Sequence, residues 1–418
     1  MPSPAAIGRR ADRISVGLWP TTAAITNPGQ PIGGVVSTDP QRGATAADEY
    51  TVRRYRPADI DGFRRLDRLV WDRDRSPEWV RWKYADNPYA DRRPVFVAEY
   101  DGEIVGARPL LAMPLRIGDR SVLAYQPADT MVHPDHRREG IFRRMTTRAL
   151  AADRETEPAL FFNFPNQHAR PGYLDLGWRV VAPEVTSYRI ETPTRVRGQD
   201  EHGLRQRAVG AAGPVLRGYY AARRALSTPP SPDDLTVQEV DGAPIERLAA
   251  LHARRRPPTI HADRTERFLR WRLASPVWER RTYLVGDPLD GEAVAAVVAR
   301  SRTTATGIRL TQVVDVAPLC GGQRWQAALW RGVEAVIESH PTTNLFAVSD
   351  GAIPHRILAA FGFLRDDSLP LSRLTTFDSK LVVRPNGDPD DGAAWRVAGR
   401  AVDDPDSWCV TFAERDTS

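Results

Sequence analysis

The stretch HPDHRREGIFRRMTTRAL, residues 133–150, decides how this sequence is interpreted. A proline-containing turn and several arginines lead to one glycine, Gly140, directly before hydrophobic residues at helical spacing. Backbone N–H groups at a helix start have no partner within the helix and lie at the positive end of its dipole. Glycine lets an anionic group approach that backbone closely. Four arginines add positive charge around it: Arg137, Arg138, Arg143 and Arg144. The pattern suits a diphosphate site, but alone it equally describes a capped, solvated basic helix.

A second motif follows in the segment NQHARPGYLDLGW, residues 166–178. It has the spacing N-x2-A-x3-Y-x3-G-aromatic, given by Asn166, Ala169, Tyr173, Gly177 and Trp178. Together with the R-x-x-G pattern at residues 137–140, this order of strand, loop, helix, strand and helix resembles the GNAT N-acetyltransferase superfamily. The resemblance covers roughly residues 50–190.

The resemblance implies a binding site for acetyl-CoA as cosubstrate. The loop whose amides would bind its pyrophosphate consists of Arg137, Arg138, Glu139, Gly140, Ile141 and Phe142. The backbone at Met131 and Val132 would pair with the pantetheine arm, and Asn166 would contact the same arm. Tyr173 would protonate the departing CoA thiolate. Phe142 departs from the family pattern, which usually has Gly or Ala at that place.

The implied reaction is direct attack of an unprotonated primary amine on the thioester, with both substrates bound. Positioning and backbone contacts to the developing oxyanion supply much of such catalysis. A general base assists an amine of high pKa. Asp129, at the end of the strand before the loop, is the first candidate, ahead of Glu99 and Glu103. Asp129 equally suits a purely structural role in fixing the loop.

Composition limits the class of protein. The chain has 418 residues, 41% of them hydrophobic and 27% charged, as in ordinary globular proteins of two or three domains. No apolar run approaches a membrane span, and no hydrophobic segment follows Arg9 and Arg10, so neither a membrane partner nor a secretory signal is expected. Two cysteines, far apart in sequence, fit a cytoplasmic location. The net charge of +5 is modest, so no nucleic-acid partner is required, and the histidines show no metal-ligand spacing.

The chain divides into four parts. Residues 1–48 are rich in small and polar residues and are expected to form a disordered leader. Residues 49–194 are expected to be the catalytic domain, 195–234 a helical and proline-rich connector, and 235–418 a second domain. The predicted fold class is α+β, with two GNAT-like domains. Each is expected to contain a mixed, mostly antiparallel twisted sheet flanked by helices.

The second domain is interpreted as a diverged repeat of the first. FLRWRLASP near residue 270 resembles WVRWKYADNP near residue 82, and ILAAFGF resembles YLDLGW, at offsets of about 185–189 residues. The second copy lacks the R-x-x-G spacing, and Leu358 stands where the tyrosine is expected. We therefore expect this copy not to catalyse but to close one wall of the acceptor site. The segment after Ser379 is expected to complete the second sheet.

The sequence thus predicts an acyl-CoA-dependent N-acetyltransferase acting on a small-molecule or peptide amine. Two alternatives remain open. One is a non-catalytic acyl-CoA-binding regulatory or scaffolding protein, which the bulky Phe142 and the diverged second copy would suit. The other is an aminoacyl-tRNA-dependent transferase, which would not need a pyrophosphate-binding loop. The residues do not name the acceptor, the acyl-chain length or the oligomeric state.

Overall fold

The computed structural model describes residues 49–90, 94–152, 158–193, 204–230, 234–288, 291–374 and 378–416. The predicted leader, residues 1–48, lies outside the described residues. We refer to residues 49–193 as the N-terminal half and to residues 204–416 as the C-terminal half.

The N-terminal half contains the predicted helices and hairpins. Its elements are β1 (Thr51–Arg54), η2 (Pro57–Asp59), α2 (Ile60–Trp71), α3 (Pro77–Val80), η3 (Arg81–Ala85), β2 (Val95–Tyr100), β3 (Glu103–Ile117), β4 (Arg120–Pro127), β5 (Met131–Val132), η4 (Pro134–His136), α4 (Ile141–Ala152), β6 (Leu160–Asn163), α5 (Arg170–Leu174), β7 (Arg179–Pro183) and β8 (Thr186–Ile190). The dipeptides Asp101-Gly102 and Gly118-Asp119, which are typical of hairpin turns, connect β2 to β3 and β3 to β4. Asp101, Gly102 and Gly118 have the positive φ that such turns require.

The C-terminal half begins with the predicted connector helix, which contains Pro214. Its elements are α7 (Leu204–Ala225), β9 (Thr236–Asp241), α8 (Ile245–Arg254), β10 (His261–Ala262), α9 (Glu266–Arg272), β11 (Glu279–Gly286), β12 (Ala293–Thr303), β13 (Arg309–Ala317), α10 (Gln323–Ser339), β14 (Leu345–Ser349), α11 (His355–Ala360), β15 (Leu364–Arg365), α12 (Leu371–Leu374), β16 (Lys380–Pro385), η5 (Gly392–Trp395), β17 (Arg396–Val397), β18 (Arg400–Ala401) and η6 (Pro405–Ser407).

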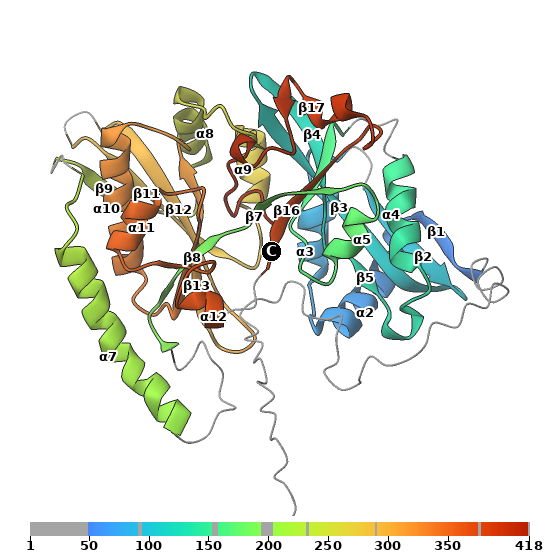
Figure 1. Ribbon diagram of the computed structural model, residues 1–418, viewed down its shortest axis with the longest axis horizontal. Helices are drawn as coiled ribbons and strands as arrows, with labels where there is room; N and C mark the ends of the chain where they lie inside the picture. Colours follow the sequence, from blue (N-terminus) through green and yellow to red (C-terminus); the bar gives the residue numbers. More distant parts are fainter. Residues whose placement is uncertain are drawn as a thin grey trace, which may run out of the picture.

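The two halves exchange strands: the N-terminal half contributes β8 to the second sheet, and the C-terminal half contributes β10 and β16 to the first. The first sheet has the order β1-β2-β3-β4-β6-β16-β7, with β5 and β10 added on β3, and the second has the order β15-β8-β14-β13-β12-β11-β9. Thus β16 lies between β6 and β7, while β8 lies between β14 and β15 (Figure 1). The expectation that the segment after Ser379 completes the second sheet is wrong, because β16 pairs with β6 and β7 of the first. Likewise, β8 precedes the predicted boundary at residue 194 but belongs to the second sheet.

Alternation along the strands places helices on both faces of the first sheet. In β2, Val95 and Val97 pack with α2 and η3 in the largest hydrophobic cluster, whereas Phe96 packs with Tyr173 of α5 on the opposite face. The same large cluster also contains residues of α8 and α9, such as Leu248, so one continuous core joins the two halves.

Two tryptophans make a reciprocal contact within this common core. Trp82 Nε1 donates to the carbonyl of Trp271 at 2.8 Å, and Trp271 Nε1 donates to the carbonyl of Trp82 at 3.0 Å. Their rings are stacked with centroids 6.4 Å apart. Ser76 caps α3 six residues before Trp82, and Thr265 caps α9 at the same spacing before Trp271. The two segments that resemble each other in sequence therefore meet face to face.

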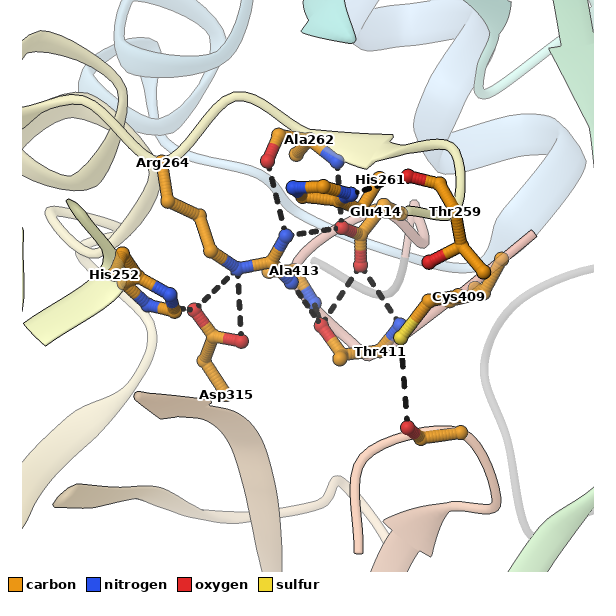
Figure 2. A network of polar contacts seen from close by, with 12 residues as sticks. His252, Thr259, His261, Ala262, Arg264, Asp315, Cys409, Thr411, Ala413 and Glu414 are labelled. Carbon is orange, nitrogen blue, oxygen red and sulfur yellow. Dashed lines mark hydrogen bonds and ion pairs between the residues drawn. The ribbon is translucent and has the colours of Figure 1, made fainter. Parts of the chain in front are cut away.

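The C-terminal segment is fixed between the halves by a buried polar network (Figure 2). The guanidinium of Arg264 pairs with Asp315 at 2.8 Å and with Glu414 at 2.7 Å, and all three side chains are almost fully buried. Glu414 in turn accepts hydrogen bonds from the backbone of Ala262 and Thr411. Since β10, which contains Ala262, pairs with β3, this network ties residues 411–416 to both sheets.

Candidate active site

A cavity opens where two parallel strands separate. β4 and β6 are paired only at Ala124–Leu160 and Tyr125–Phe161. After β4 the chain turns away from β6 at Asp129, which has a φ of 39°. The next strand, β5, pairs with β3 and not with β6. The resulting cavity has a volume of about 720 Å³ and is lined on its two sides by the ends of β4 and β6.

The predicted diphosphate loop forms one end of this cavity. Of the predicted cofactor residues, those that line the cavity are Val132, Arg137, Arg138, Gly140, Ile141, Phe142 and Asn166. Among the described residues, Met131 and Glu139 do not line it: Met131 is buried in the core and Glu139 is exposed. Gly140 has a φ of 71°, and its carbonyl accepts the first hydrogen bond of α4, from Arg144 at 3.0 Å. The amides of the first turn of α4 are therefore free of intrahelical partners at the cavity edge.

Tyr173 lies on α5 with its side chain buried and its residue lining the cavity. Its hydroxyl oxygen accepts two hydrogen bonds, from Arg108 Nη1 at 2.9 Å and from Asn163 Nδ2 at 2.8 Å. Arg108 Nη1 also donates to Thr130 Oγ1 at 2.9 Å. A tyrosine oxygen that accepts from two nitrogens keeps its own proton for donation elsewhere. The arrangement is suited to delivering a proton into the cavity, with a guanidinium next to the negative charge that would remain.

Sequence reasoning missed Arg108 and Asn163. Arg108 is 1% exposed within the otherwise apolar run of residues 104–115 in β3, and Asn163 ends the apolar strand β6. A charged or amide side chain inside an apolar run was the available signal, since buried polar groups need partners.

The bulky Phe142 packs against α5. Its ring lies edge-on to Tyr173 with centroids 5.7 Å apart, and a Cβ added to Gly172 would lie 2.9 Å from it. Gly172 therefore provides the space for this ring, and Arg108 lies over it at 5.0 Å. The ring is part of the wall around the tyrosine hydroxyl.

Asp129 is held by cations and is badly placed to act as a general base. Its carboxylate contacts Arg75 at 2.9 Å and Lys83 at 2.5 Å, and it accepts the hydroxyl hydrogen bond of Tyr84 at 2.6 Å. Burial raises its pKa, but Arg75 and Lys83 outweigh this and hold the pKa well below its ordinary value. Such a carboxylate binds protons poorly at neutral pH, so the geometry argues against the base role and supports the structural alternative.

Asn166 acts on the local backbone. Its Oδ1 accepts hydrogen bonds from the amides of His168 at 3.0 Å and Ala169 at 2.8 Å, and its carbonyl accepts from Arg170 at 3.0 Å. The asparagine thereby sets the start of α5, which carries Tyr173. It also lines the cavity.

The opposite end of the cavity is made by the exchanged strand and the C-terminal half. The lining residues here are Glu184, Thr186, Tyr188, Asp366, Ser379, Arg415 and Asp416. The side chain of Glu184 pairs with Arg415, whose pKa burial lowers to about 9. The Asp366 carboxyl accepts the amide hydrogen of Thr186 at 3.1 Å, and burial raises its pKa to about 6. The cavity is thus basic at one end and carries carboxylates at the other.

Within the described residues, no group of three or more His, Cys, Asp and Glu side chains is arranged to hold a metal ion. Every described helix is too short or too polar to cross a lipid bilayer.

Comparisons with known proteins agree with the geometry. Residues 51–181 match the family model of the acetyltransferase (GNAT) domain. No curated protein matches the chain. A conserved protein of unknown function from Enterococcus faecalis V583, described as a probable N-acyltransferase, shares the fold with a TM-score of 0.52 and 11% identity, over 80% of this chain and 72% of that one. Saccharomyces cerevisiae N-myristoyltransferase with bound myristoyl-CoA has a TM-score of 0.51 and 11% identity, over 80% and 78%. A GCN5-related N-acetyltransferase from Anabaena variabilis ATCC 29413 has a TM-score of 0.49 and 13% identity, over 81% and 73%.

Proposed function

Since residues 51–181 form a GNAT acetyltransferase domain, we propose that this protein is an N-acyltransferase that transfers acetyl from acetyl-CoA to a primary amine. The amine attacks the thioester directly while both substrates occupy the cavity. The observation that carries this proposal is that Tyr173 lines the cavity while its buried hydroxyl accepts hydrogen bonds from Arg108 and Asn163.

The donor binds at the basic end of the cavity. The amides at the start of α4 and the side chains of Arg137 and Arg138 hold the pyrophosphate, because a helix N-terminus beside arginines favours a doubly charged anion. The backbone at Val132, in the gap between the diverging strands, pairs with the pantetheine arm. The thioester then lies near the Tyr173 hydroxyl.

The chemistry needs few groups because the thioester is already activated. The amine lone pair attacks the carbonyl carbon, a C–N bond forms and the C–S bond breaks, and the nitrogen loses one proton to solvent to become the amide. The Tyr173 hydroxyl gives its proton to the departing sulfur, and Arg108 stabilises the phenolate that remains. Typical general-acid assistance of this kind accelerates a reaction by about 10²–10⁴-fold.

The C-terminal half is proposed to be a degenerate copy that builds the acceptor wall. Three features support this: the exchange of β8 and β16 between equivalent places in the two sheets, the reciprocal Trp82–Trp271 contact, and the sequence repeats. At the place equivalent to the diphosphate loop, a Cβ on Gly321 would lie 2.3 Å from Trp325, so the indole fills that space. Leu358, at the place equivalent to Tyr173, is fully buried and apolar.

The length of the acyl chain has two candidates. Acetyl is proposed from the family match, and a longer chain is the alternative, because a structural neighbour was described with bound myristoyl-CoA. The cavity walls include large hydrophobic side chains such as Trp71, Phe164 and Tyr188, which could contact an acetyl group or a longer acyl chain. Titration with acetyl-CoA and with myristoyl-CoA distinguishes the two by their relative affinity.

Replacing Tyr173 tests the proposal. CoA release from acetyl-CoA is measured with n-butylamine and with hydroxylamine as acceptors. We expect Tyr173→Phe to lower kcat by about 10²-fold or more with unchanged acetyl-CoA affinity. Tyr219→Phe, on the exposed connector helix α7, is the matched control. Acetyl-CoA binding without amine-dependent CoA release by the native protein would instead support the non-catalytic alternative. Transfer of an aminoacyl group from tRNA would support the other alternative, an aminoacyl-tRNA-dependent transferase.

A further inference from the structure

The amine must lose a proton before it attacks, and Asp129 is not available to take it. An alkylamine is largely protonated at neutral pH, so its lone pair must be exposed by a base within reach, directly or through one water. The search for this base is limited to the carboxylates that line the cavity. These are Asp129, Glu184, Asp366 and Asp416.

Three of the four are bound to cations. Asp129 contacts Arg75 and Lys83, Asp416 contacts Lys83, and Glu184 contacts Arg415. Each of these carboxylates is the counter-ion of a buried or largely buried cation, and protonating it would leave that cation without its partner.

Asp366 is different. Among the cavity carboxylates in the described part of the chain, it has no cation within salt-bridge distance. The neighbouring Arg365 directs its guanidinium to Asp350 at 2.7 Å and to Asp367 at 2.8 Å instead. The Asp366 carboxylate accepts hydrogen bonds from backbone amides, that of Thr186 at Oδ1 and its own, and it lines the cavity.

The charged groups around Asp366 come from three segments. Arg365 and Asp367 are its chain neighbours, Glu184 precedes β8, and Arg415 of the C-terminal segment pairs with Glu184 and donates to Thr186 Oγ1 at 3.0 Å. Burial, with the charge of Asp367, raises its pKa to about 6, against the lowering effects of the Thr186 amide and Arg365. Such a carboxylate is still ionised at neutral pH but binds a proton more strongly than an ordinary one.

We propose that Asp366, from the C-terminal half, binds the ammonium group of the acceptor and takes its proton. The proton moves from nitrogen to the carboxylate, and the freed lone pair forms the C–N bond as the C–S bond breaks. Sulfur receives its proton from Tyr173. The nitrogen, now bonded to the acyl carbon, gives up its second proton to solvent, from which Tyr173 regains one. Asp366 then releases the proton it took, so that one proton is released per turnover. This inference rests on the proposed function and makes the C-terminal half part of the reacting site.

Two acceptor amines of different basicity test the proposed role of Asp366 as the base. n-Butylamine is protonated at about pH 7.5 and needs the base, whereas hydroxylamine is largely unprotonated there and does not. For Asp366→Asn we expect kcat/KM with n-butylamine to fall about 100-fold, and the decrease of kcat/KM below about pH 6 to disappear from the pH profile. Turnover of hydroxylamine should stay within about threefold of that of the native protein. Asp366→Glu should recover part of the loss. Asp390→Asn, at an exposed position of the C-terminal half outside the cavity, is the matched control.

The outcomes separate the inference from the proposed function. Equal loss with both amines would mean that Asp366 has only a structural role. An unchanged rate and pH profile with n-butylamine would also overturn the inference, while leaving the acyltransferase proposal intact. If the native protein releases no CoA with either amine, the proposed function fails, whatever the variants do.

Discussion

Replacing Asp129 by asparagine should cost stability rather than remove a catalytic group. The carboxylate is 5% exposed and is shared by Arg75, Lys83 and Tyr84. Asparagine has nearly the same shape, but it removes the negative charge and turns one acceptor oxygen into a donor. Lys83, whose side chain is fully buried, then keeps only Asp416 as its counter-ion. Removing one partner of a buried ion pair typically costs about 3–5 kcal/mol.

The effect should depend on pH in one direction. Because the folded-state pKa of Asp129 lies well below its ordinary value, the stabilisation is present above the unfolded pKa and is lost as pH falls through the folded one. The difference between native protein and Asp129→Asn should therefore be constant near neutrality and shrink below about pH 4.

The assay is guanidinium unfolding followed by tryptophan fluorescence, together with the pH profile of CoA release. Asp74→Asn is the matched control, because Asp74 pairs with Arg68 and Arg64 on the surface and should leave the free energy of unfolding nearly unchanged. The reasoning is refuted if Asp129→Asn is as stable as the native protein but loses activity about 100-fold together with the acidic limb. That result would restore Asp129 as the general base.

Three further changes test other parts of the account. Arg108→Met should lower kcat at least about tenfold at unchanged acetyl-CoA affinity, and Arg108→Lys should recover part of this loss. If Arg108→Met and the native protein had equal kcat, Arg108 would not be needed to position the Tyr173 hydroxyl. Trp271→Phe leaves the buried carbonyl of Trp82 without its donor and should cost about 1–3 kcal/mol in the free energy of unfolding; no loss would mean that the reciprocal contact is dispensable. Burial raises the pKa of Asp67 to about 6, so its ionisation destabilises the fold increasingly as pH rises from about 4 to about 6, and Asp67→Asn should gain up to about 3 kcal/mol relative to native protein between about pH 4 and pH 7. Unfolding at both pH values checks this, and a gain that is the same at both would be evidence against a raised pKa.

Local signals in the sequence predicted much of the fold. The Asp101-Gly102 turn needs positive φ at adjacent residues, and that chemistry is visible without any tertiary contact. The helix after Gly140 follows from its hydrophobic spacing, and the resemblance implied a role for Tyr173 whose hydroxyl the structure places against the cavity.

The strand exchange could not be predicted in the same way. The alternation of buried and exposed side chains in β8 and β16 would be the same in either sheet. This pattern shows which face of a strand is buried, but it does not show which strand lies next to it. The choice between the two sheets depends on tertiary contacts alone.

The role of Asp129 also depends on residues far away in sequence. Lys83 lies 46 residues from Asp129, and Asp416 lies 333 residues from Lys83. A strand-end aspartate looks the same in the sequence whether it is a base or a counter-ion. The buried lysine, one of only two in the chain, was the remaining signal.

The most direct test of the central claim is calorimetric titration of acetyl-CoA into the native protein and into an Arg137→Glu, Arg138→Glu variant. The account predicts micromolar binding to the native protein and at least about tenfold weaker binding to the variant, because the pyrophosphate would meet two negative charges at the start of α4. Equal binding to both proteins would place the donor elsewhere, and no binding of acetyl-CoA or myristoyl-CoA to the native protein would contradict the acyltransferase account itself.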